Sequence, residues 1–284
     1  MDNFFDSILE RSFEWYETQE TIPEGLSFHG EESDLPLLDE IDTLILMHRD
    51  VHFSGSFTAM LEYYRNESAK GIQDEVEIER IRFLESIQKG LKRDLAPLLI
   101  TGRDAERVAQ AKKMYQELSR LAENDNPEGQ LAAATLSERS EEELVDELLP
   151  IMRGNEKLLL SLATSDFLLD PLFPGYGTGP RIAIVLLGAL CYEPAIPILF
   201  ARIGQTDFRT ESAIVHALHL MGEPVKKICL KKLVAKPISQ DNERAAIVLA
   251  YFLPDQKIEA QAKSLLSEVD DAIFRDYLKT LINV

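Results

Sequence analysis

Apolar residues recur along this chain every three to four positions, which is the spacing of a helix with one buried face. Residues 74–91 show it clearly, with Phe83, Ile87 and Leu91 among the apolar positions, and residues 104–123 show it again. No stretch of useful length alternates apolar and polar residues as a half-buried strand does. The sequence therefore predicts an all-α protein.

The same spacing predicts further helices. Residues 37–64 form either one kinked helix or two short helices, because Ser54-Gly55-Ser56 interrupts the pattern. The remaining predicted helices outside the repeats described next span residues 3–17, 140–152, 156–168 and 271–282.

A repeated tripeptide marks the C-terminal half. Ala-Ile-Val begins at residues 183, 213 and 246, so its spacings are 30 and 33 residues. Superposing the first occurrence on the second also aligns Glu193-Pro194 with Glu223-Pro224. A period in this range is typical of stacked structural repeats.

Each repeat has the pattern of a helical hairpin. In the second, residues 209–221 place apolar side chains at helical spacing. Gly222 ends that helix, because glycine takes the left-handed cap conformation without steric cost. Pro224 suits the first turn of the next helix, where its missing amide has no intrahelical partner. One such hairpin cannot bury its apolar face alone, so neighbouring hairpins must stack.

The residues around the turn of the second hairpin resemble a known repeat. Asp207-Phe208-Arg209 and Met221-Gly222-Glu223-Pro224-Val225 are similar to the HEAT-like repeat of the phycobilin-lyase type. The first hairpin is similar at Ala189-Leu190 and Glu193-Pro194-Ala195, whereas in the third Pro254-Asp255 replaces the glycine-acid-proline turn. The resemblance implies an α-solenoid that binds other macromolecules. Because such repeats also occur in enzymes, it leaves the activity open.

These patterns divide the chain into three parts. Residues 1–125 are predicted to form an acidic helical domain, 126–139 a linker, and 140–284 a HEAT-like helical repeat domain whose clearest copies span 180–266. The linker falls where Asn124-Asp125-Asn126-Pro127-Glu128-Gly129 gathers turn-forming residues. The predicted fold is thus an acidic N-terminal helical domain followed by a HEAT-like α-solenoid of helical hairpins.

Charge is distributed unevenly along the chain. The 284 residues carry a net charge of −19. Residues 171–284 hold 13 Lys and Arg against 12 Asp and Glu, so the first 170 residues carry a net charge of −20. Phosphate backbones are bound through Lys and Arg. The acidity therefore argues against nucleic acid as the partner and is compatible with a basic protein.

The cysteines and the N-terminus add little chemistry. Cys191 and Cys229 fall on apolar repeat positions and are predicted to be buried, and two cysteines supply neither a disulfide framework nor a metal-ligand set. No stretch approaches the ~20 apolar residues of a membrane span, and Met1-Asp2-Asn3 is not a basic leader. We therefore expect a cytoplasmic protein that uses no membrane, metal or cofactor.

A histidine pair and a glycine-rich loop invite a chemical interpretation, but each has a simpler one. His48 and His52 lie four residues apart, as a metal pair on a helix requires, yet no third ligand accompanies them, so packing is favoured. Residues 175–180, Gly-Tyr-Gly-Thr-Gly-Pro, lack the preceding strand and the lysine of a phosphate-binding loop. We interpret them as the joint that leads into the repeats. No catalytic residue is predicted.

Polar residues in and around the repeats that are expected to be exposed are the candidate partner-binding residues. They are Arg209, His216, His219, Lys227, Lys231 and Arg244. Arg209 and Arg244 have the alternative role of bracing neighbouring repeats. The lysines belong to a basic cluster at 226–236, which faces the acidic half, an acidic partner or solvent.

The predicted function is therefore that of a non-enzymatic interaction or adaptor protein, which binds a macromolecular partner, expected to be a protein, on the solenoid face. The alternative is an enzyme on a HEAT-like scaffold. The resemblance implies that a bilin-lyase-like activity be considered, but no cysteine or histidine-carboxylate cluster supports it. A nucleic-acid-modifying enzyme requires a basic groove with aromatic residues, and this chain offers one short lysine cluster beside an acidic half.

Overall fold

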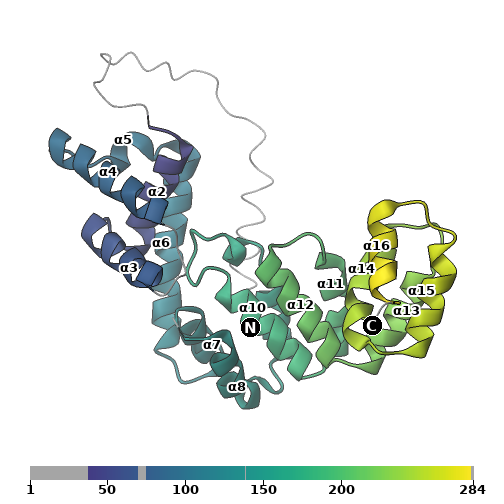
Figure 1. Ribbon diagram of the computed structural model, residues 1–284. Coiled ribbons are helices and arrows are strands. Elements are labelled where there is room, and N and C mark those ends of the chain that lie inside the picture. Colours follow the sequence, from purple (N-terminus) through teal and green to yellow (C-terminus); the bar gives the residue numbers. More distant parts are fainter. Residues whose placement is uncertain (1–37, 70–74, 138, 283–284) are drawn as a thin grey trace.

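The computed structural model describes residues 38–69, 75–137 and 139–282, and every regular element in them is a helix (Figure 1). The all-α prediction is confirmed. The predicted helix over residues 3–17 lies outside the described residues. The first α-helices are α2 (Glu40–His52), α3 (Phe57–Ala69), α4 (Glu75–Leu91), α5 (Ala96–Leu99) and α6 (Gly102–Ala122). They are followed by α7 (Pro127–Thr135), α8 (Glu141–Met152), α9 (Glu156–Ala163), α10 (Thr178–Ala189), α11 (Ile196–Arg202), α12 (Phe208–Leu220), α13 (Glu223–Leu233), α14 (Gln240–Leu249), α15 (Gln256–Leu266) and α16 (Ala272–Thr280). Three short 3-10 helices also occur, η1 (Phe167–Leu169), η2 (Glu193–Ala195) and η3 (Ala250–Phe252).

The interrupted pattern of residues 37–64 corresponds to two short helices rather than one kinked helix. α2 begins with a capping box, in which Asp39 and Asp42 each accept a hydrogen bond from the other's backbone amide, at 3.0 and 2.9 Å. After α2, Ser54 and Gly55 take φ values of 51° and 77°, which lie in the left-handed region and turn the chain into α3.

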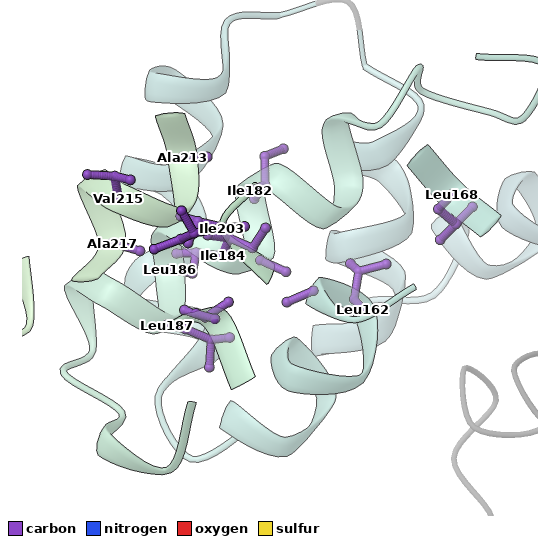
Figure 2. Close-up of a cluster of buried hydrophobic side chains, with 14 of the residues drawn as sticks. Leu162, Leu168, Ile182, Ile184, Leu186, Leu187, Ile203, Ala213, Val215 and Ala217 are labelled. Carbon is purple, nitrogen blue, oxygen red and sulfur yellow. The ribbon is translucent and has the colours of Figure 1, made fainter. Parts of the chain in front are cut away.

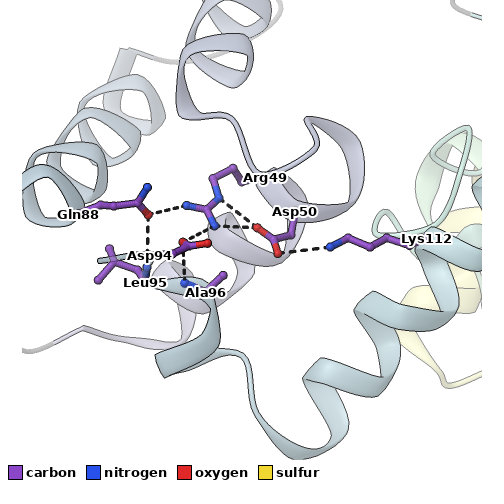
Figure 3. Close-up of polar contacts among 7 residues, drawn as sticks. All are labelled: Arg49, Asp50, Gln88, Asp94, Leu95, Ala96 and Lys112. Carbon is purple, nitrogen blue, oxygen red and sulfur yellow. Dashed lines mark hydrogen bonds and ion pairs between the residues drawn. The ribbon is translucent and has the colours of Figure 1, made fainter. Parts of the chain in front are cut away.

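A buried arginine ties α2 to its neighbours. The Arg49 side chain is fully buried, and its guanidinium donates hydrogen bonds to Asp50 (2.7 Å), Gln88 (2.8 Å) and Asp94 (2.8 Å), as Figure 3 shows. It also lies over the ring of Phe57, 4.6 Å from the centroid. Partial burial raises the pKa of the Asp94 carboxyl, but the hydrogen bond and charge of Arg49 together with hydrogen bonds from the backbone amides of Ala96 and Leu95 outweigh it, so the net pKa is lowered. The group α2–α5 is thus organised around a charge.

The prediction of a linker over residues 126–139 is wrong in its local structure, because residues 127–135 form α7. Asn126 caps this helix by accepting a hydrogen bond from the amide of Gly129 (2.7 Å), and Pro127 occupies the first turn. α7 packs against α6 and α10, and its Leu131 and Ala132 are fully buried. The turn-forming residues therefore start a packed helix instead of a hinge.

Each C-terminal helix packs against helices that lie near it in the sequence. α10 contacts α8, α9 and α12, and α14 contacts α12, α13 and α16. In Figure 1 these helices extend away from α6 toward α16. Their core is apolar, and the first Ala-Ile-Val triad belongs to it through the fully buried Ala183 and Ile184. Figure 2 shows the α10 side chains gathered with Ala213, Val215 and Ala217 of α12.

A close backbone approach joins α10 to α12. A Cβ atom at Gly188 would lie 2.5 Å from the Cα of Ala217, closer than van der Waals contact allows. The two helices are therefore in contact through their smallest residues, and only glycine fits at position 188 without a shift.

The prediction that both cysteines are buried is wrong for Cys191, which is exposed, and correct for Cys229. Cys191 has a φ of 51° and follows the last turn of α10, where its amide donates to the Gly188 carbonyl oxygen and the amide of Tyr192 donates to that of Leu187. These bonds form a Schellman motif with Cys191 at the left-handed position. In the next hairpin the positive φ falls on Gly222, one position later in the aligned repeat. This shift turns Cys191 outward.

Candidate interaction surface

Three of the predicted partner-binding residues lie on α12 and are exposed. His216 and His219 are one turn apart near the C-terminal end of the helix. Arg209 stands at its N-terminal end beside Phe208, which is 87% exposed. Ten residues of α-helix separate Arg209 from His219, or about 15 Å along the axis. The histidines and the arginine therefore belong to different parts of the surface.

The ends of three helices meet around His219. Its ring packs edge-on against Phe252, with the centroids 5.0 Å apart, and lies 6.4 Å from the ring of Tyr251. The next residue, Leu220, has its carbonyl oxygen 3.9 Å from the Sγ of Cys191. We call Cys191, His219, Leu220, Tyr251 and Phe252 the helix-end row. It follows the C-terminal ends of α10, α12 and α14.

The helix-end row is both apolar and accessible. Tyr251 is 54% exposed and Leu220 41% exposed, and none of the five side chains carries a permanent charge. Exposed aromatic and aliphatic side chains that lie together are more common at interaction sites than elsewhere on a surface. Of this row, only His219 was among the residues predicted to bind a partner. Leu220 aligns with the apolar Leu190 and Tyr251 with Leu218, so the repeat pattern does not mark them as exposed.

The basic cluster at 226–236 is mostly neutralised within the repeats. Lys226 pairs with Asp255, Lys232 with Asp241 at 2.5 Å, and Lys236 with Glu268 at 3.1 Å. Each of these carboxylates follows the lysine in sequence by no more than 32 residues. Among the described residues, the partners of these three lysines therefore lie among the C-terminal helices and not in α2–α6.

Lys227 and Lys231 differ from the other lysines of α13. Both are exposed, and no carboxylate of the described residues lies within ion-pair distance of either. They are four residues apart and therefore share one face of α13.

The expectation that Arg244 is exposed is wrong. It is only 8% exposed, and its Nε donates a hydrogen bond to the carbonyl oxygen of Ile203 (2.8 Å), while its other nitrogens donate to Asp241 (3.2 Å) and Gln240 (3.0 Å). Arg244 thus braces α14 against the residue that follows α11, which was the alternative role given to it. The buried guanidinium of Arg244 satisfies the carbonyl oxygen of Ile203, which would otherwise lack a hydrogen-bond partner in the core.

The structure also brings together two features that were judged separately in the sequence. His52 of α2 stacks on the ring of Tyr176 from the glycine-rich loop, with the centroids 4.6 Å apart, and lies 5.2 Å from the ring of His48. Its Nδ1 is 2.8 Å from the Tyr115 hydroxyl of α6, and its Nε2 is 3.2 Å from the carbonyl oxygen of Pro171. We call His48, His52, Tyr115, Pro171 and Tyr176 the joint cluster.

The segment that contains Pro171 and Tyr176 is held on its other side by α7. A Cβ atom at Gly175 would lie 2.2 Å from the carbonyl oxygen of Thr135, and one at Gly179 would lie 2.6 Å from its hydroxyl oxygen. Arg107 of α6 adds an ion pair with Asp170 at 2.7 Å. The glycines therefore permit a close backbone contact with α7, as a joint between groups of helices requires.

Both histidines of the joint cluster are held neutral. Burial, followed by the nearby His48, lowers the pKa of His52 to about 4, against the opposing hydrogen bond to Pro171. Burial also lowers the pKa of His48, with Arg107 in the same direction and Asp170 in the opposite one. The signal for this cluster in the sequence was weak, because residues 48 and 176 come together only through the fold.

Few groups in the described residues suit metal or nucleophilic chemistry. Over 38–69, 75–137 and 139–282, no three His, Cys, Asp or Glu side chains are placed to hold a metal ion. Burial raises the pKa of the Cys229 thiol to about 12, so this cysteine remains protonated. Within the same ranges, no helix has the length and apolar character needed to cross a membrane.

Comparison with known proteins yields no match: no family model, no curated protein and no solved structure is similar to this chain.

Proposed function

We propose that this protein is a non-enzymatic adaptor, which binds another protein on the surface of a HEAT-like α-solenoid formed by its C-terminal part. The acidic N-terminal helices form a separate domain before it. The hairpins α10–α11, α12–α13 and α14–α15 are the three repeats.

The packing of the first helices of these hairpins supports the repeat assignment. α12 contacts both α10 and α14, which are the first helices of the preceding and the following hairpin. The Ala-Ile-Val triads contribute Ala183, Ala213 and Ala246 to the core, each no more than 9% exposed. Equivalent alanines on successive helices allow the close approach that stacked repeats need.

The observation that carries the proposal is the helix-end row. It places an apolar surface on three successive hairpins, and the residues at its centre, His219 and Leu220, are exposed although their neighbours in α12 are core residues. A protein partner would cover Tyr251 and Leu220 with apolar side chains of its own, since buried aromatic residues contribute most of the affinity at such interfaces. Lys227 and Lys231 would meet carboxylates on that partner, because no carboxylate of the described residues pairs with them.

A photo-crosslinking residue tests this proposal directly. The full chain carries p-benzoylphenylalanine at position 251, or at position 91, where Leu91 of α4 is exposed to a similar degree as Leu220. In native lysate, we expect position 251 to capture a discrete protein and position 91 not to capture it. Leu220→Glu should abolish the capture from position 251, since it places a charge in the row, whereas Leu91→Glu should not.

Other outcomes contradict the adaptor proposal. Equal capture from both positions would mean that the row is not a specific surface. If the full chain instead retains only nucleic acid or a bilin chromophore, the protein belongs to the enzyme class given as the alternative.

A further inference from the structure

The joint cluster connects distant parts of the chain. His52 lies 119 residues from Pro171 in sequence, and 63 residues from Tyr115. It therefore attaches the loop at residues 170–177 to both α2 and α6. The Arg107–Asp170 ion pair supports the same attachment from α6.

We propose that the joint cluster is an acid-sensitive latch: proton uptake by its two histidines releases residues 170–177 from α2 and α6. The device is independent of the proposed adaptor function, because it concerns a contact within the chain.

The hydrogen bonds of His52 indicate which protonation state of its imidazole fits the closed contact. The carbonyl oxygen of Pro171 can only accept, so Nε2 of His52 must carry the proton. In the neutral ring Nδ1 is then an acceptor, and the Tyr115 hydroxyl donates to it. A second proton on Nδ1 would reverse this bond: Nδ1 would donate, and the Tyr115 hydroxyl would have to accept and turn its own proton away.

His48 makes the closed contact less tolerant of charge. Its Nδ1 is buried and has no hydrogen-bond partner among the described residues, so a proton there would have nothing to donate to. The two rings are also 5.2 Å apart, and two imidazolium ions at that distance repel each other.

In the part of the chain that the structure describes, the charged groups around the cluster do not supply a free counter-ion. On α2, the two charged residues between the histidines are engaged elsewhere: Arg49 with Gln88 and Asp94, and Asp50 with Arg49 and Lys112. Facing the cluster from α6 and the loop are Arg107 and Asp170, which neutralise each other. The remaining polar side chains in contact, Tyr115 and Tyr176, are phenols and not carboxylates.

Linkage sets the size and the pH range of the effect. In the released state His52 has the ordinary pKa of about 6.5, and in the closed state about 4. The closed contact is thus fully stable above pH 6.5 and is weakened as the pH falls from 6.5 toward 4. Over this window the equilibrium constant for opening rises nearly tenfold per pH unit, or about 30-fold between pH 7.5 and 5.0 for His52 alone.

Hydrogen exchange of the full chain measures this opening. Amides of residues 44–56 and 165–182 are followed at pH 7.5 and pH 5.0, with exchange times scaled for the intrinsic pH dependence of the chemistry. We expect protection in both segments to fall by about 30-fold or more at pH 5.0, while segments of α12 and α13 keep theirs.

Two paired variants separate the latch from general acid effects. His48→Leu with His52→Gln removes both titrating groups, and the glutamine retains one donor for Pro171 and one acceptor for Tyr115. This variant should show no acid-induced loss of protection. His216→Gln with His219→Gln removes the exposed pair of α12 and should behave as the wild type does.

Three results would overturn the latch. The first is unchanged protection of the wild type at pH 5.0, and the second is an equal acid response in the His48→Leu, His52→Gln variant. If that variant does not fold, the imidazole resonances of the wild type decide, with single substitutions for assignment. The third result that would overturn the latch is a pKa of 6.5 or higher for both His48 and His52. A stabilising contact of the imidazolium with Tyr176 would give such values.

Discussion

The helix contacts within α2–α5 and within α10–α15 are formed by different kinds of side chain. In the first region the centre of the contact is ionic: Arg49 is fully buried among polar partners, and the equally buried Asp42 pairs with Arg80 at 2.5 Å. In the second, α10 meets α12 through Gly188 and Ala217. The ionic contact requires specific hydrogen-bond partners, whereas the apolar contact requires small side chains.

This difference bears on how much of each region the sequence could predict. Small residues at a fixed period can be seen along the chain, and such a period is typical of stacked repeats. A buried charge depends on partners from several helices, and the 39 and 45 residues that separate Arg49 from Gln88 and Asp94 contain no signal that joins them. Three pairs of substitutions, in order of decreasing effect, test how far this contrast holds.

Replacing Arg49 should have the largest effect. Arg49→Ala leaves Gln88 and two carboxylates without their donor, and breaking a buried charge network of this kind costs about 3–5 kcal/mol. Urea unfolding followed by circular dichroism measures the loss. Hydrogen exchange should place it in α2–α5, with α10–α15 little changed.

Arg82→Ala is the matched control, because Arg82 is exposed on α4 and should shift stability by less than about 0.5 kcal/mol. A similarly small effect for Arg49→Ala would mean that the ionic centre does not stabilise this region.

The same substitution in the two regions should have opposite signs. Gly188→Ala places a methyl group against the α12 backbone, which should destabilise the protein by about 2 kcal/mol. Gly90→Ala, near the end of α4, meets nothing within 4 Å and should stabilise it by up to about 1 kcal/mol, through helix propensity alone. Denaturant midpoints of both variants at equal protein concentration give the comparison. Two shifts of the same sign would remove the distinction between the regions.

The period of the repeats was a sound guide to the helices, but not to their ends. The predicted helix over 156–168 stops at Ala163, since α9 gives way to the 3-10 turn η1. At 126–139, asparagine, proline and glycine predict a linker because they favour turns, although Asn126 and Pro127 are equally suited to start a helix. Local residues thus predict where the chain changes direction, and tertiary packing decides whether a helix begins there.

The candidate surface shows the same limit. His216 and His219 are exposed, as predicted, whereas Arg244 is not. A buried arginine cannot be told from an exposed one in the sequence, because the contact with Ile203 is known only from the fold. The joint cluster required knowledge that residues 48–52 and 170–176 meet. A helical spacing of two histidines and a run of glycines contain no information about that contact.

The smallest effect concerns the turn after α10, where the positive φ falls on Cys191 and not on a glycine. Cys191 occupies a left-handed position (φ 51°), which costs a residue with a Cβ about 1 kcal/mol relative to glycine. Cys191→Gly should therefore stabilise the protein by about 0.5 kcal/mol, because the greater freedom of glycine in the unfolded chain offsets part of the gain. Gly222→Ala, at φ 71° and ψ −135° in the next hairpin, should instead destabilise the protein by about 1 kcal/mol or more, since this conformation belongs almost only to glycine. Both changes are measured as shifts in the urea midpoint under reducing conditions. If Cys191→Gly destabilises, its side chain contributes more through the contact with Leu220 than its backbone conformation costs.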